Sequence, residues 1–553
     1  MLLTGAQILI EELVRNKIDT VFGYPGGAVL DIYDELYKNE ERLRHVISAH
    51  EQGAVHAADG YARVSGKTGV VIATSGPGAT NLVTGIANAY LDSVPLVVIT
   101  GNVATALLGK DSFQEVDIVG ITQPIVKHNH IVRDVNDLAN EIASAFNVAS
   151  SGRKGPVLID IPKDIQRTKC EYNPCTPPMN DNRVMGNINE AIEAINNCEK
   201  PYIYSGGGVI AANAEKEVLA LSQKISAPIG LSMMGLTAIP HSYQLNLGMC
   251  GMHGRYAASV VQSKADIMIA VGVRFSDRAT GDIAEYTKNC RVIHIDIDHA
   301  ELGKNVPDII ELCGDAKQIL SAITEKINEK HNNEWIETIA KDLQVDANAK
   351  KEPSEENIFS PKNIIHTIRE YLNDDTIIAT DVGQHQMWVM QNYRFEKPRT
   401  LLTSGGLGTM GYGLGAAIGG CIACGKKRTV LFTGDGSFGM NLNELATVVS
   451  QELPITIVLL NNGVLGMVRQ WQGMFYEERY STTTLKRKTD FPALAKAFGA
   501  DGISVDSIDA LRKVLNTQLP CDRPFLIDCH INMDEKVFPM IPPGGSVRDI
   551  RIG

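Results

Sequence analysis

The sequence has few aromatic residues, no excess of positive charge and no long apolar run, and each absence narrows its possible classes. Phe, Trp and Tyr make up 6% of the 553 residues. The small and aliphatic residues that dominate instead are typical of α/β proteins with buried parallel strands. A formal net charge of −12 argues against nonspecific binding to nucleic acid, which needs a basic surface. No apolar run approaches the roughly 20 residues that span a bilayer, so we expect a cytoplasmic protein without membrane contact.

The sequence also lacks the features of a secreted protein. Glu11 and Glu12 interrupt the apolar residues near the amino terminus, which indicates an amphipathic helix rather than a signal peptide. The ten cysteines all lie from Cys170 onward and show no spacing of a disulfide framework. Cys421 and Cys424 form one CxxC pair without a second pair or a nearby histidine. A buried helix face explains this pair better than a zinc site or redox chemistry.

The chain is too long for one ordinary core, and its composition divides it into three pieces. Two segments read as linkers: residues 171–182 are rich in Pro, Asn and Asp, and residues 341–361 are charged and lack a hydrophobic period. We therefore predict domains at residues 1–175, 183–345 and 360–553.

Each piece alternates short apolar runs that are rich in β-formers with stretches of helical pattern. The runs are TVFGY, GVVIAT, PLVVITG and PVLIDIP in the first piece, PYIYS, ADIMIAVGV and RVIHIDID in the second, and DTIIAT, RTVLFT, ITIVLLNN and PFLIDCHI in the third. This alternation predicts an α/β protein with three doubly wound parallel sheets, although no sequence repeat is convincing. Ligands of such sheets bind beyond the carboxyl ends of the strands, so functional residues should follow the runs.

Polar residues follow two successive strands of the third piece. Asp435 ends the run RTVLFTGD, and Asn462 follows it by 27 residues (435 to 462), after one helix and the next strand. The carboxyl ends of two such strands can be neighbours in a right-handed βαβ unit. A carboxylate and an amide oxygen suit Mg²⁺, which usually completes its coordination with phosphate and water. A tight turn and an asparagine-ended strand are the alternative, but the spacing across this secondary structure favours a metal–diphosphate site.

Other residues that follow strands in the third piece fit the same site. The turn that contains Gly436 and Ser437 lets backbone NH groups approach a phosphate at a helix start. Gly383, Gln384 and His385 follow the strand DTIIAT and could reach a diphosphate. The glycine-rich loop 404–413 enters a helix, and Met410 within it is either a support beneath a ring or core packing.

The second piece contains one weak sign of a dinucleotide site. SGGG, residues 205–208, follows the strand PYIYS, and such a loop can approach a dinucleotide closely.

Together these segments resemble the thiamine-diphosphate enzymes, whose signature is GDG followed at about this interval by NN. The resemblance covers essentially the whole chain and implies a pyrimidine-binding, a central and a diphosphate-binding domain, in that order. It implies that Asp435, Asn462 and the carbonyl of Val464 bind the metal. It also implies that Glu51, in SAHEQGAVHAADGYAR, bonds to the aminopyrimidine of a cofactor held by the partner subunit. That contact favours the imino tautomer, which places a base beside the reactive thiazolium carbon.

Within those enzymes the chain is most similar to the acetohydroxyacid synthase (acetolactate synthase) family. The matching segments are VFGYPGGAVLDIYD, TSGPGATN, DSFQEVDIVGIT, GPVLIDIPKDIQ, GMHG, GVRFSDRATGD, SGGLGTMGYG and GMVRQWQ. They are long, occur in the family's order and lie in all three pieces.

The resemblance implies roles for residues around the reacting groups. Gly27 should donate a backbone hydrogen bond near the reacting carbonyl, and Lys163 should lie near the entrance of the channel. Arg278 should bind the carboxylate of the second keto acid, a task that suits a guanidinium. The remaining residues should line the channel, support the aminopyrimidine or form the substrate wall: Phe113, Gln114, Gly408, Met410, Met467, Val468 and Trp471.

The resemblance also implies a bound FAD, which in this family is structural in the main reaction. The segments that correspond to flavin contacts contribute Arg153, Gly206, Gly207, Gly208, His253, Arg274, Asp296 and Asp315. Two residues depart from the family pattern. Ser276 stands where the family usually has aspartate, and Ala104 replaces a frequent proline beside the channel.

The reaction that the resemblance implies joins two 2-keto acids. Pyruvate loses CO₂, and its hydroxyethyl unit is transferred to a second pyruvate, giving 2-acetolactate, or to 2-ketobutyrate, giving 2-aceto-2-hydroxybutyrate. Trp471 should favour 2-ketobutyrate as acceptor. The family arrangement implies a homodimer or homotetramer with the site at a subunit interface, and a separate regulatory small subunit is common.

Three alternatives stay open. A pyruvate oxidase also uses thiamine diphosphate and FAD, and a catabolic acetolactate synthase lacks FAD. The segments SDR and VRQWQ favour the synthase over the oxidase, and RFSDR argues against the FAD-free enzyme. A noncatalytic assembly subunit is the third alternative, and the presence of Glu51, Asp435 and Asn462 argues against it.

Overall fold

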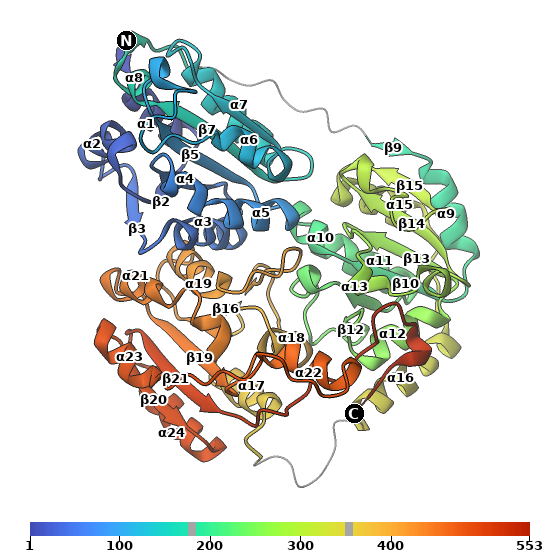
Figure 1. Ribbon diagram of the computed structural model, residues 1–553. Coiled ribbons are helices and arrows are strands. Elements are labelled where there is room, and N and C mark those ends of the chain that lie inside the picture. Colours follow the sequence, from blue (N-terminus) through green and yellow to red (C-terminus); the bar gives the residue numbers. More distant parts are fainter. Residues whose placement is uncertain (175–183, 349–357, 553) are drawn as a thin grey trace.

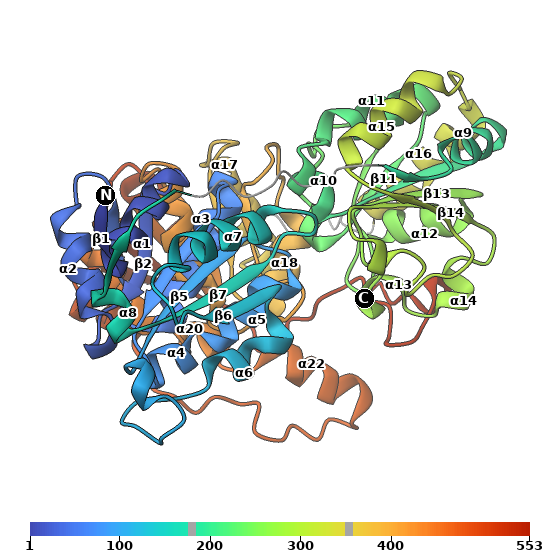
Figure 2. The ribbon, with the colours of Figure 1, turned by 90° about the horizontal axis from the view of Figure 1, so that it is seen from above.

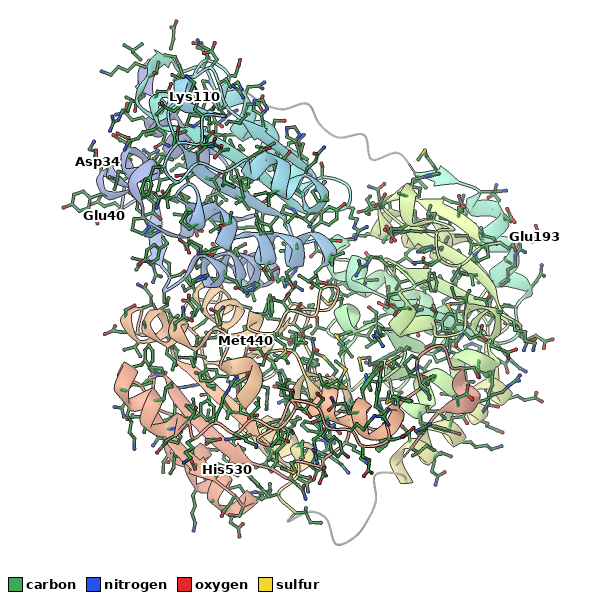
Figure 3. All side chains as sticks on the ribbon, viewed as in Figure 1. Asp34, Glu40, Lys110, Glu193, Met440 and His530 are labelled. Atoms are coloured by element: carbon green, nitrogen blue, oxygen red, sulfur yellow. The ribbon has the colours of Figure 1, made fainter. Side chains whose placement is uncertain are left out.

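The chain forms three lobes arranged around a ring in the computed structural model (Figure 1). The structure describes residues 1–174, 184–348 and 358–552, which we call the first, central and third lobes. The first and third lobes face each other through helices, and the central lobe closes the ring beside both (Figures 1 and 2). Charged side chains such as Asp34, Glu40 and Glu193 lie on the outer rim of the ring (Figure 3).

The first lobe is built on a six-stranded parallel sheet with the order β3-β2-β4-β5-β7-β6. Helices α1, α2 and α7 cover one face, and α3 and α5 cover the other. The strands are β2 (Thr20–Tyr24), β3 (Arg44–Ile47), β4 (Gly69–Ala73), β5 (Leu96–Asn102), β6 (His128–Ile131) and β7 (Pro156–Pro162), with β1 (Leu2–Thr4) and β8 (Lys169–Glu171) paired separately. The helices are α1 (Gly5–Arg15), α2 (Leu30–Lys38), α3 (Glu51–Ser65), α4 (Pro77–Asn81), α5 (Val83–Leu91), α6 (Ile118–Thr122), α7 (Leu138–Ser150) and α8 (Lys163–Arg167).

The third lobe repeats this plan with the order β17-β16-β18-β19-β21-β20, again all parallel. Helices α19, α21 and α23 cover one face, and α17, α18 and α24 cover the other. The strands are β16 (Ile377–Thr380), β17 (Leu401–Leu402), β18 (Thr429–Gly434), β19 (Ile455–Asn461), β20 (Asp501–Val505) and β21 (Phe525–His530). The helices are α17 (Pro361–Glu370), α18 (Gln384–Asn392), α19 (Tyr412–Ala423), α20 (Asp435–Phe438), α21 (Leu445–Ser450), α22 (Gly466–Phe475), α23 (Phe491–Phe498) and α24 (Ile508–Gln518).

The central lobe has a different strand order, β12-β11-β10-β13-β14-β15-β9, in which only the edge strand β9 is antiparallel. Without β9 this is the order 3-2-1-4-5-6 of dinucleotide-binding sheets. The strands are β9 (Met185–Gly186), β10 (Pro201–Ser205), β11 (Ile229–Leu231), β12 (Asn246–Met249), β13 (Ile267–Val271), β14 (Arg291–Asp296) and β15 (Ile310–Cys313). The helices are α9 (Ile188–Asn197), α10 (Gly207–Ala212), α11 (Glu215–Ile225), α12 (Tyr256–Lys264), α13 (Asp277–Thr280), α14 (Ile283–Tyr286), α15 (Ala316–Lys326) and α16 (Asn333–Asn348).

The first and third lobes share a hydrophobic core through the contact of α3 with α19. A Cβ atom at Gly60 would overlap the Ala416 carbonyl, and one at Gly419 would overlap the Ala57 carbonyl. The two helix backbones therefore touch, and only glycine fits at these positions. This contact fixes the distance between the lobes.

The fold confirms the prediction of an α/β protein with doubly wound parallel sheets, but it corrects two local interpretations. Residues 341–348 are not linker, because α16 runs to Asn348. Its charged residues misled the sequence reading: Lys264 pairs with Asp342 at 2.7 Å and Arg255 with Asp346 at 2.8 Å, and both aspartates are buried. The turn predicted after Gly434 is instead the one-turn helix α20, and the helix predicted beyond it begins as a 3₁₀ turn (Leu442–Glu444) that continues into α21.

The remaining expectations of the sequence analysis stand as follows. The rest of both linker segments falls largely on residues 175–183 and 349–357, outside the described residues. Cys421 is buried in α19, as expected for a core face, and Cys424 lies at the end of that helix. Among the described residues no helix combines the length and apolar character needed to cross a bilayer.

Candidate active site

The third lobe brings together the two residues predicted to bind a metal. Strands β18 and β19 are adjacent, with Gly434 opposite Leu460, so Asp435 and Asn462 both follow the same sheet edge. Burial raises the pKa of Asp435 to about 6, although hydrogen bonds from backbone NH groups, including that of Asn462, oppose this shift. A buried carboxyl with a raised pKa is the state expected where a cation would supply the missing countercharge.

The segment around Asn462 has the geometry of a ligand turn. The Val464 NH donates to Asn462 Oδ1 at 3.2 Å, which holds the two predicted ligands in one turn. Asn462 Nδ2 donates to Gln384 Oε1 at 3.3 Å, and Gln384 Nε2 donates to Gln470 Oε1 at 3.0 Å. Gln384, which was predicted to contact the cofactor, therefore has its side chain engaged in fixing Asn462 and α22.

His385 provides a free donor or acceptor at the same edge. Its ring packs against Gly434, where a Cβ atom would lie 3.0 Å from Nδ1. Nε2 is buried and has no hydrogen-bond partner among the described residues. Burial lowers the pKa of His385 to about 3, so the ring is neutral near pH 7. Gly436 and Ser437 lie beside it in α20, both buried.

Two buried side chains that the sequence analysis did not select hold the glycine-rich loop. Asp381 Oδ1 accepts hydrogen bonds from the NH groups of Gly411 at 2.8 Å and Val382 at 3.0 Å. Gln386 Nε2 donates to Thr403 Oγ1 at 2.7 Å and to the Ser404 carbonyl at 3.0 Å. The position of Asp381 directly after β16 was the signal that could have identified it.

The loop opens onto a cavity of about 1640 Å³ between the three lobes. This is more than the roughly 300–1,000 Å³ of a pocket for one drug-sized ligand. Seven residues predicted for diphosphate contact, aminopyrimidine support or substrate contact line it: Gly383, Gly408, Met410, Met467, Val468, Trp471 and Arg278. Seven residues predicted for flavin contact also line it: Arg153, Gly207, Gly208, His253, Arg274, Asp296 and Asp315.

Arg278 and Trp471 meet in this cavity from different lobes. The guanidinium carbon of Arg278 lies 5.4 Å from the centre of the Trp471 ring, a cation–π distance. Arg278 Nη1 contacts Met252 Sδ at 3.3 Å, and the side chain stays 59% exposed. An exposed guanidinium held by an aromatic face is available to bind a carboxylate.

The residues predicted for flavin contact lie near the place where the central sheet reverses its strand order. Gly206 and Gly208 pack so closely against Gly272 that a Cβ atom at either would overlap its backbone. Burial lowers the pKa of His253 to about 4, with a further contribution from the Arg278 charge, and its Nδ1 has no partner among the described residues. Burial raises the pKa of Asp296 to about 6.

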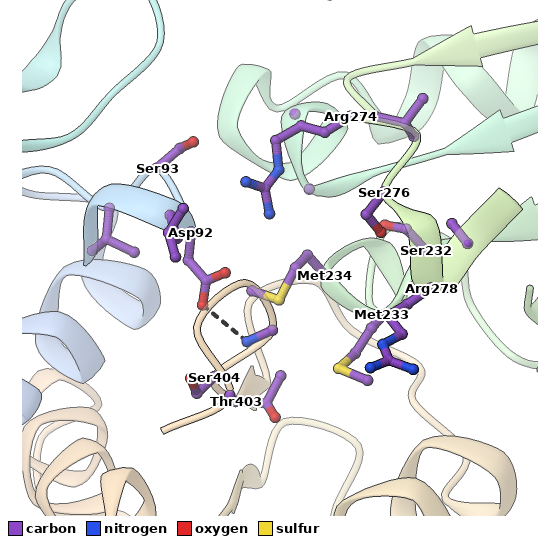
Figure 4. A pocket seen from close by; sticks show the side chains of 18 of the residues that line it. Asp92, Ser93, Ser232, Met233, Met234, Arg274, Ser276, Arg278, Thr403 and Ser404 are labelled. Carbon is purple, nitrogen blue, oxygen red and sulfur yellow. Dashed lines mark hydrogen bonds between the residues drawn. The ribbon is translucent and has the colours of Figure 1, made fainter. Parts of the chain in front are cut away.

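The other residues on this side make ordered contacts. Arg153 Nη1 donates to Glu301 Oε1 at 2.7 Å. Asp315 caps α15 by accepting from the Gln318 NH at 3.0 Å. Arg274 and Ser276 both face the cavity (Figure 4).

The first lobe gathers a separate group of predicted residues. Glu51 is the first residue of α3 and is largely buried, and its Oε2 accepts a hydrogen bond from Asn81 Nδ2 at 2.9 Å. A Cβ atom at Gly78 would lie 3.3 Å from Glu51 Oε1, so the loop after β4 faces this carboxyl. Gln114 packs its backbone against Gly76 of the same loop.

Lys163 and Gly27 also belong to this group. Lys163 Nζ donates to the Gly27 carbonyl at 2.8 Å, which orients the turn that follows β2. Phe113 is 87% exposed. The lining of the large cavity contains none of Gly27, Glu51, Phe113, Gln114 or Lys163. Within one chain the predicted residues thus fall into two groups, which we call the two halves of the site: this group in the first lobe, and the residues of the third and central lobes.

Comparison with known proteins gives the chain a family. Three thiamine pyrophosphate enzyme models match: the N-terminal TPP binding domain at residues 3–121, the central domain at 188–323 and the C-terminal TPP binding domain at 381–529. The acetolactate synthase large subunit of Corynebacterium glutamicum is 42% identical over 570 residues, which cover 99% of this chain and 90% of the relative. The chain belongs to the acetolactate synthase large-subunit family.

Further relatives extend this family match. The acetolactate synthase isozyme 3 large subunit of Escherichia coli is 41% identical over 577 residues, 99% of this chain and 98% of the relative. The acetolactate synthase large subunit of Mycobacterium tuberculosis is 42% identical over 572 residues, 99% of this chain and 91% of the relative. The resemblance to acetolactate synthases and the thiamine-diphosphate-enzyme architecture are thus confirmed, whereas the roles of individual residues stay predictions.

Proposed function

We propose that this acetolactate synthase family member decarboxylates pyruvate and joins its hydroxyethyl unit to a second pyruvate or to 2-ketobutyrate. The products are 2-acetolactate and 2-aceto-2-hydroxybutyrate. The observation that carries the proposal is the meeting of Arg278 with Trp471, 5.4 Å apart, in the cavity that also contains Gly408 and Met410. A carboxylate-binding group and an aromatic wall beside the glycine-rich loop suit a second keto acid as acceptor.

The residues at the third sheet edge fit thiamine diphosphate with Mg²⁺. Asp435, Asn462 Oδ1 and the Val464 carbonyl supply three oxygen ligands of the kind that Mg²⁺ prefers. The unpaired Nε2 of neutral His385 is a candidate donor to a diphosphate oxygen. When bound, thiamine diphosphate would supply a weakly acidic ring carbon as the nucleophile and a cationic ring as the electron sink for decarboxylation. Glu51 would hold a proton at the aminopyrimidine and so promote deprotonation of that ring carbon.

Arg278 and Trp471 would bind and orient the acceptor. Arg278 can donate two parallel hydrogen bonds to a carboxylate, which fixes the direction of the keto group. Trp471 bounds the space for the alkyl group, and one methylene in such a pocket is worth about 10- to 200-fold in selectivity. Val468, which is half exposed, and Met467 extend this apolar wall.

The central lobe fits FAD. Its strand order is that of dinucleotide-binding sheets, and the close packing of Gly206 and Gly208 clears the crevice between β10 and β13. Arg153 and Arg274 are cations for an anionic pyrophosphate, and His253 Nδ1 is an unused polar atom there. A flavin in this lobe would complete the cavity wall, and no redox step is assigned to it.

A homodimer or homotetramer would unite the two halves of the site. Neither Glu51 nor Asp435 lines the large cavity, so that cavity does not join the two halves within one chain. Large apolar side chains near both halves are exposed, as expected of a surface that another chain covers: Phe113 at 87%, Met440 at 61% and Val468 at 51%. A separate small regulatory subunit is proposed from the family name alone, and a cytoplasmic location stays a prediction.

Complementation tests the shared site. Glu51→Gln and Asp435→Asn chains, each of low activity alone when cofactor is limiting, should regain activity under the same conditions when unfolded together and refolded as mixed dimers. Random pairing makes half of the dimers mixed, and each has one intact site, so about a quarter of wild-type activity should return. Refolding each variant alone is the control. Mixed dimers without recovered activity would contradict a site that two chains share.

Product analysis tests the reaction. Purified protein with thiamine diphosphate, Mg²⁺ and FAD should convert pyruvate to acetolactate without consuming an electron acceptor, and 2-ketobutyrate should divert the product. Acetate or acetyl phosphate would instead identify a pyruvate oxidase. Full activity of a colourless, flavin-free protein would identify an FAD-independent synthase.

A further inference from the structure

A carboxylate of the first lobe holds the glycine-rich loop of the third lobe. Asp92 Oδ2 accepts a hydrogen bond from the Gly405 NH at 3.0 Å, and Oδ1 accepts one from the Gly406 NH at 2.7 Å. The Asp92 side chain is fully buried. It points into the loop above Thr403 and Ser404, at the wall of the large cavity (Figure 4).

The opposite side of this loop rests on the central lobe. A Cβ atom at Gly405 would overlap Met234 Sδ, and one at Gly406 would lie 3.1 Å from Arg274 Nη2 and 3.0 Å from Asp92 Oδ1. Asp92, Met234 and Arg274 thus converge on the two glycines (Figure 4). The backbone of the loop is clamped between the other two lobes, and a side chain would force the clamp apart.

A buried network of hydrogen bonds and ion pairs holds Asp92 in place. Arg63 Nη2 donates to Asp92 Oδ2 at 3.0 Å, and Arg63 Nε donates to Asp59 Oδ1 at 2.6 Å. Tyr412, the first residue of α19, donates its hydroxyl to Asp59 Oδ1 at 2.7 Å. Two backbone NH groups and a guanidinium compensate the buried carboxylate of Asp92. The network therefore ties α3, α5 and α19 to the loop.

A second contact from α5 fixes the next part of the loop. Ser404 Oγ donates to Asn88 Oδ1 at 2.5 Å, and the Thr409 NH donates to Ser404 Oγ at 2.9 Å. The bonded residues Ser404 and Thr409 lie on either side of Gly408, and Met410 follows Thr409 directly; Gly408 and Met410 line the cavity on the proposed thiamine side.

The residue after Asp92 faces the proposed flavin side. Arg153 Nε donates to Ser93 Oγ at 2.9 Å, while Arg153 Nη1 pairs with Glu301 at 2.7 Å. Arg153 and Arg274 are the two cations proposed to face the dinucleotide. One connected set of contacts therefore runs from Arg153 through Ser93 and Asp92 to the glycine-rich loop.

We propose that Asp92 is a positioning residue that couples the two cofactor sites. A dinucleotide that engages Arg153 and Arg274 stiffens the clamp, and Asp92 transmits this to the loop that carries Gly408 and Met410. The inference rests on the proposed binding of both FAD and thiamine diphosphate. Coupling of this kind is reciprocal, and effects of about 5- to 150-fold in affinity are typical.

Calorimetric titration of the full-length apoprotein with thiamine diphosphate and Mg²⁺, with and without saturating FAD, measures the coupling. FAD should tighten thiamine diphosphate binding to the wild type by about 5-fold or more. Asp92→Asn should reduce that factor to below about 2-fold, because one amide NH₂ group now opposes the loop NH groups. Asp266→Asn is the matched control: Asp266 also accepts from two consecutive NH groups, those of Glu199 and Lys200, but lies outside the cavity lining. It should keep the wild-type factor.

Ser93→Ala keeps the test valid if Asp92→Asn does not fold. It removes only the contact with Arg153, so thiamine diphosphate affinity without FAD should stay within about 2-fold of wild type while the coupling weakens. Coupling that survives in both Asp92→Asn and Ser93→Ala, or that is absent from a wild type that binds both cofactors, overturns the coupling role of Asp92 and leaves the proposed function intact. A wild type that binds no FAD overturns the proposed flavin site and the coupling with it.

Discussion

The sheets of the first and third lobes have the same topology but different chemistry at their edges. Both place their strands in the order second, first, third, fourth, sixth, fifth, and both are wholly parallel. In each, the first and third strands are neighbours whose connections leave in opposite directions, which creates a crevice at their carboxyl ends. In the third lobe Asp381 and Asp435 follow these strands. In the first lobe Gly26 and Thr74 follow them and pack against each other.

The difference shows that the sheet topology creates the crevice and that the side chains around it determine what it can bind. The third lobe has buried carboxyls and a free imidazole nitrogen at the crevice, and so suits a metal and a diphosphate. The first lobe fills the same crevice by packing and instead presents Glu51 at the start of a helix. Substitutions that affect one lobe and spare the other test this division.

Glu51→Gln, in the first lobe, should have the largest effect on activity of the substitutions that test this division. It keeps the shape and the Asn81 contact but cannot move a proton, so kcat should fall by about 100- to 10,000-fold. The affinity for thiamine diphosphate, measured by calorimetry, should stay near wild type. Glu141→Gln, in the first turn of α7 in the same lobe, is the matched control and should be fully active. An active Glu51→Gln protein would refute the assigned proton transfer.

Asp435→Asn, in the third lobe, should mainly lower the affinity for the cofactors, whereas Glu51→Gln lowers kcat. It removes one anionic ligand, so the affinity for Mg²⁺ and thiamine diphosphate should fall by about 10- to 100-fold or more. Titration of activity with each cofactor checks this, and saturating cofactor should recover part of the rate. Asp522→Asn, on an exposed side chain of the same lobe, should leave both parameters unchanged. Unaltered metal dependence in Asp435→Asn would remove Asp435 from the metal site.

Trp471→Leu should have a smaller effect, confined to the choice of acceptor. Loss of the aromatic wall should shift the ratio of 2-aceto-2-hydroxybutyrate to 2-acetolactate by about 10-fold or more towards acetolactate. Competition between pyruvate and 2-ketobutyrate measures the ratio directly. Phe475→Leu, which removes the ring that packs edge-on against Trp471, is the neighbouring control and should change the ratio less. An unchanged product ratio in Trp471→Leu would contradict the assigned wall.

Asp296→Asn should have the smallest effect, seen as pH-dependent stability of the central lobe. Burial raises the pKa of Asp296 from 3.8 to about 6, so the folded state binds this proton more tightly than the unfolded state. Its contribution is therefore most favourable below about pH 4 and is lost as the pH rises to about 6. The apoprotein variant should gain unfolding temperature relative to wild type over that interval, by about 2–4 °C per kcal/mol. A difference that is independent of pH would exclude this titration.

The sequence predicted the parts of the fold whose signals are local. Strands β18 and β19 are continuous buried runs that end in glycine and asparagine, so their edge and the pair Asp435 and Asn462 could be read directly. Short or exposed strands such as β9 and β17 have two residues each and left no pattern. The end of helix α16 was predicted as linker because Asp342 and Asp346 look like solvent-facing charges in the sequence, whereas both pair within the protein.

The contacts that hold the site together could not be predicted in the same way. Asp92 binds a loop more than 300 positions away, Asn88 binds Ser404, and Arg278 meets Trp471 only through the packing of two lobes. Asp92 and Asn88 alone look like ordinary polar residues on a helix, and the roles predicted for Arg278 and Trp471 did not include their contact with each other. Their partners are set by the relative placement of the lobes, which local periodicity does not encode.

The close backbone contact between α3 and α19, at Gly60 and Gly419, makes the two helices one rigid unit. Glu51 stands at one end of α3, and the loop with Gly408 and Met410 leads into α19. Because Gly60 and Gly419 let the backbones touch, neither helix can tilt without the other. In the proposed dimer, Glu51 would act in the partner's site and the loop with Gly408 and Met410 in the chain's own site. The two would therefore move together. A displacement at one catalytic centre would therefore be transmitted to the other through the packed helices α3 and α19.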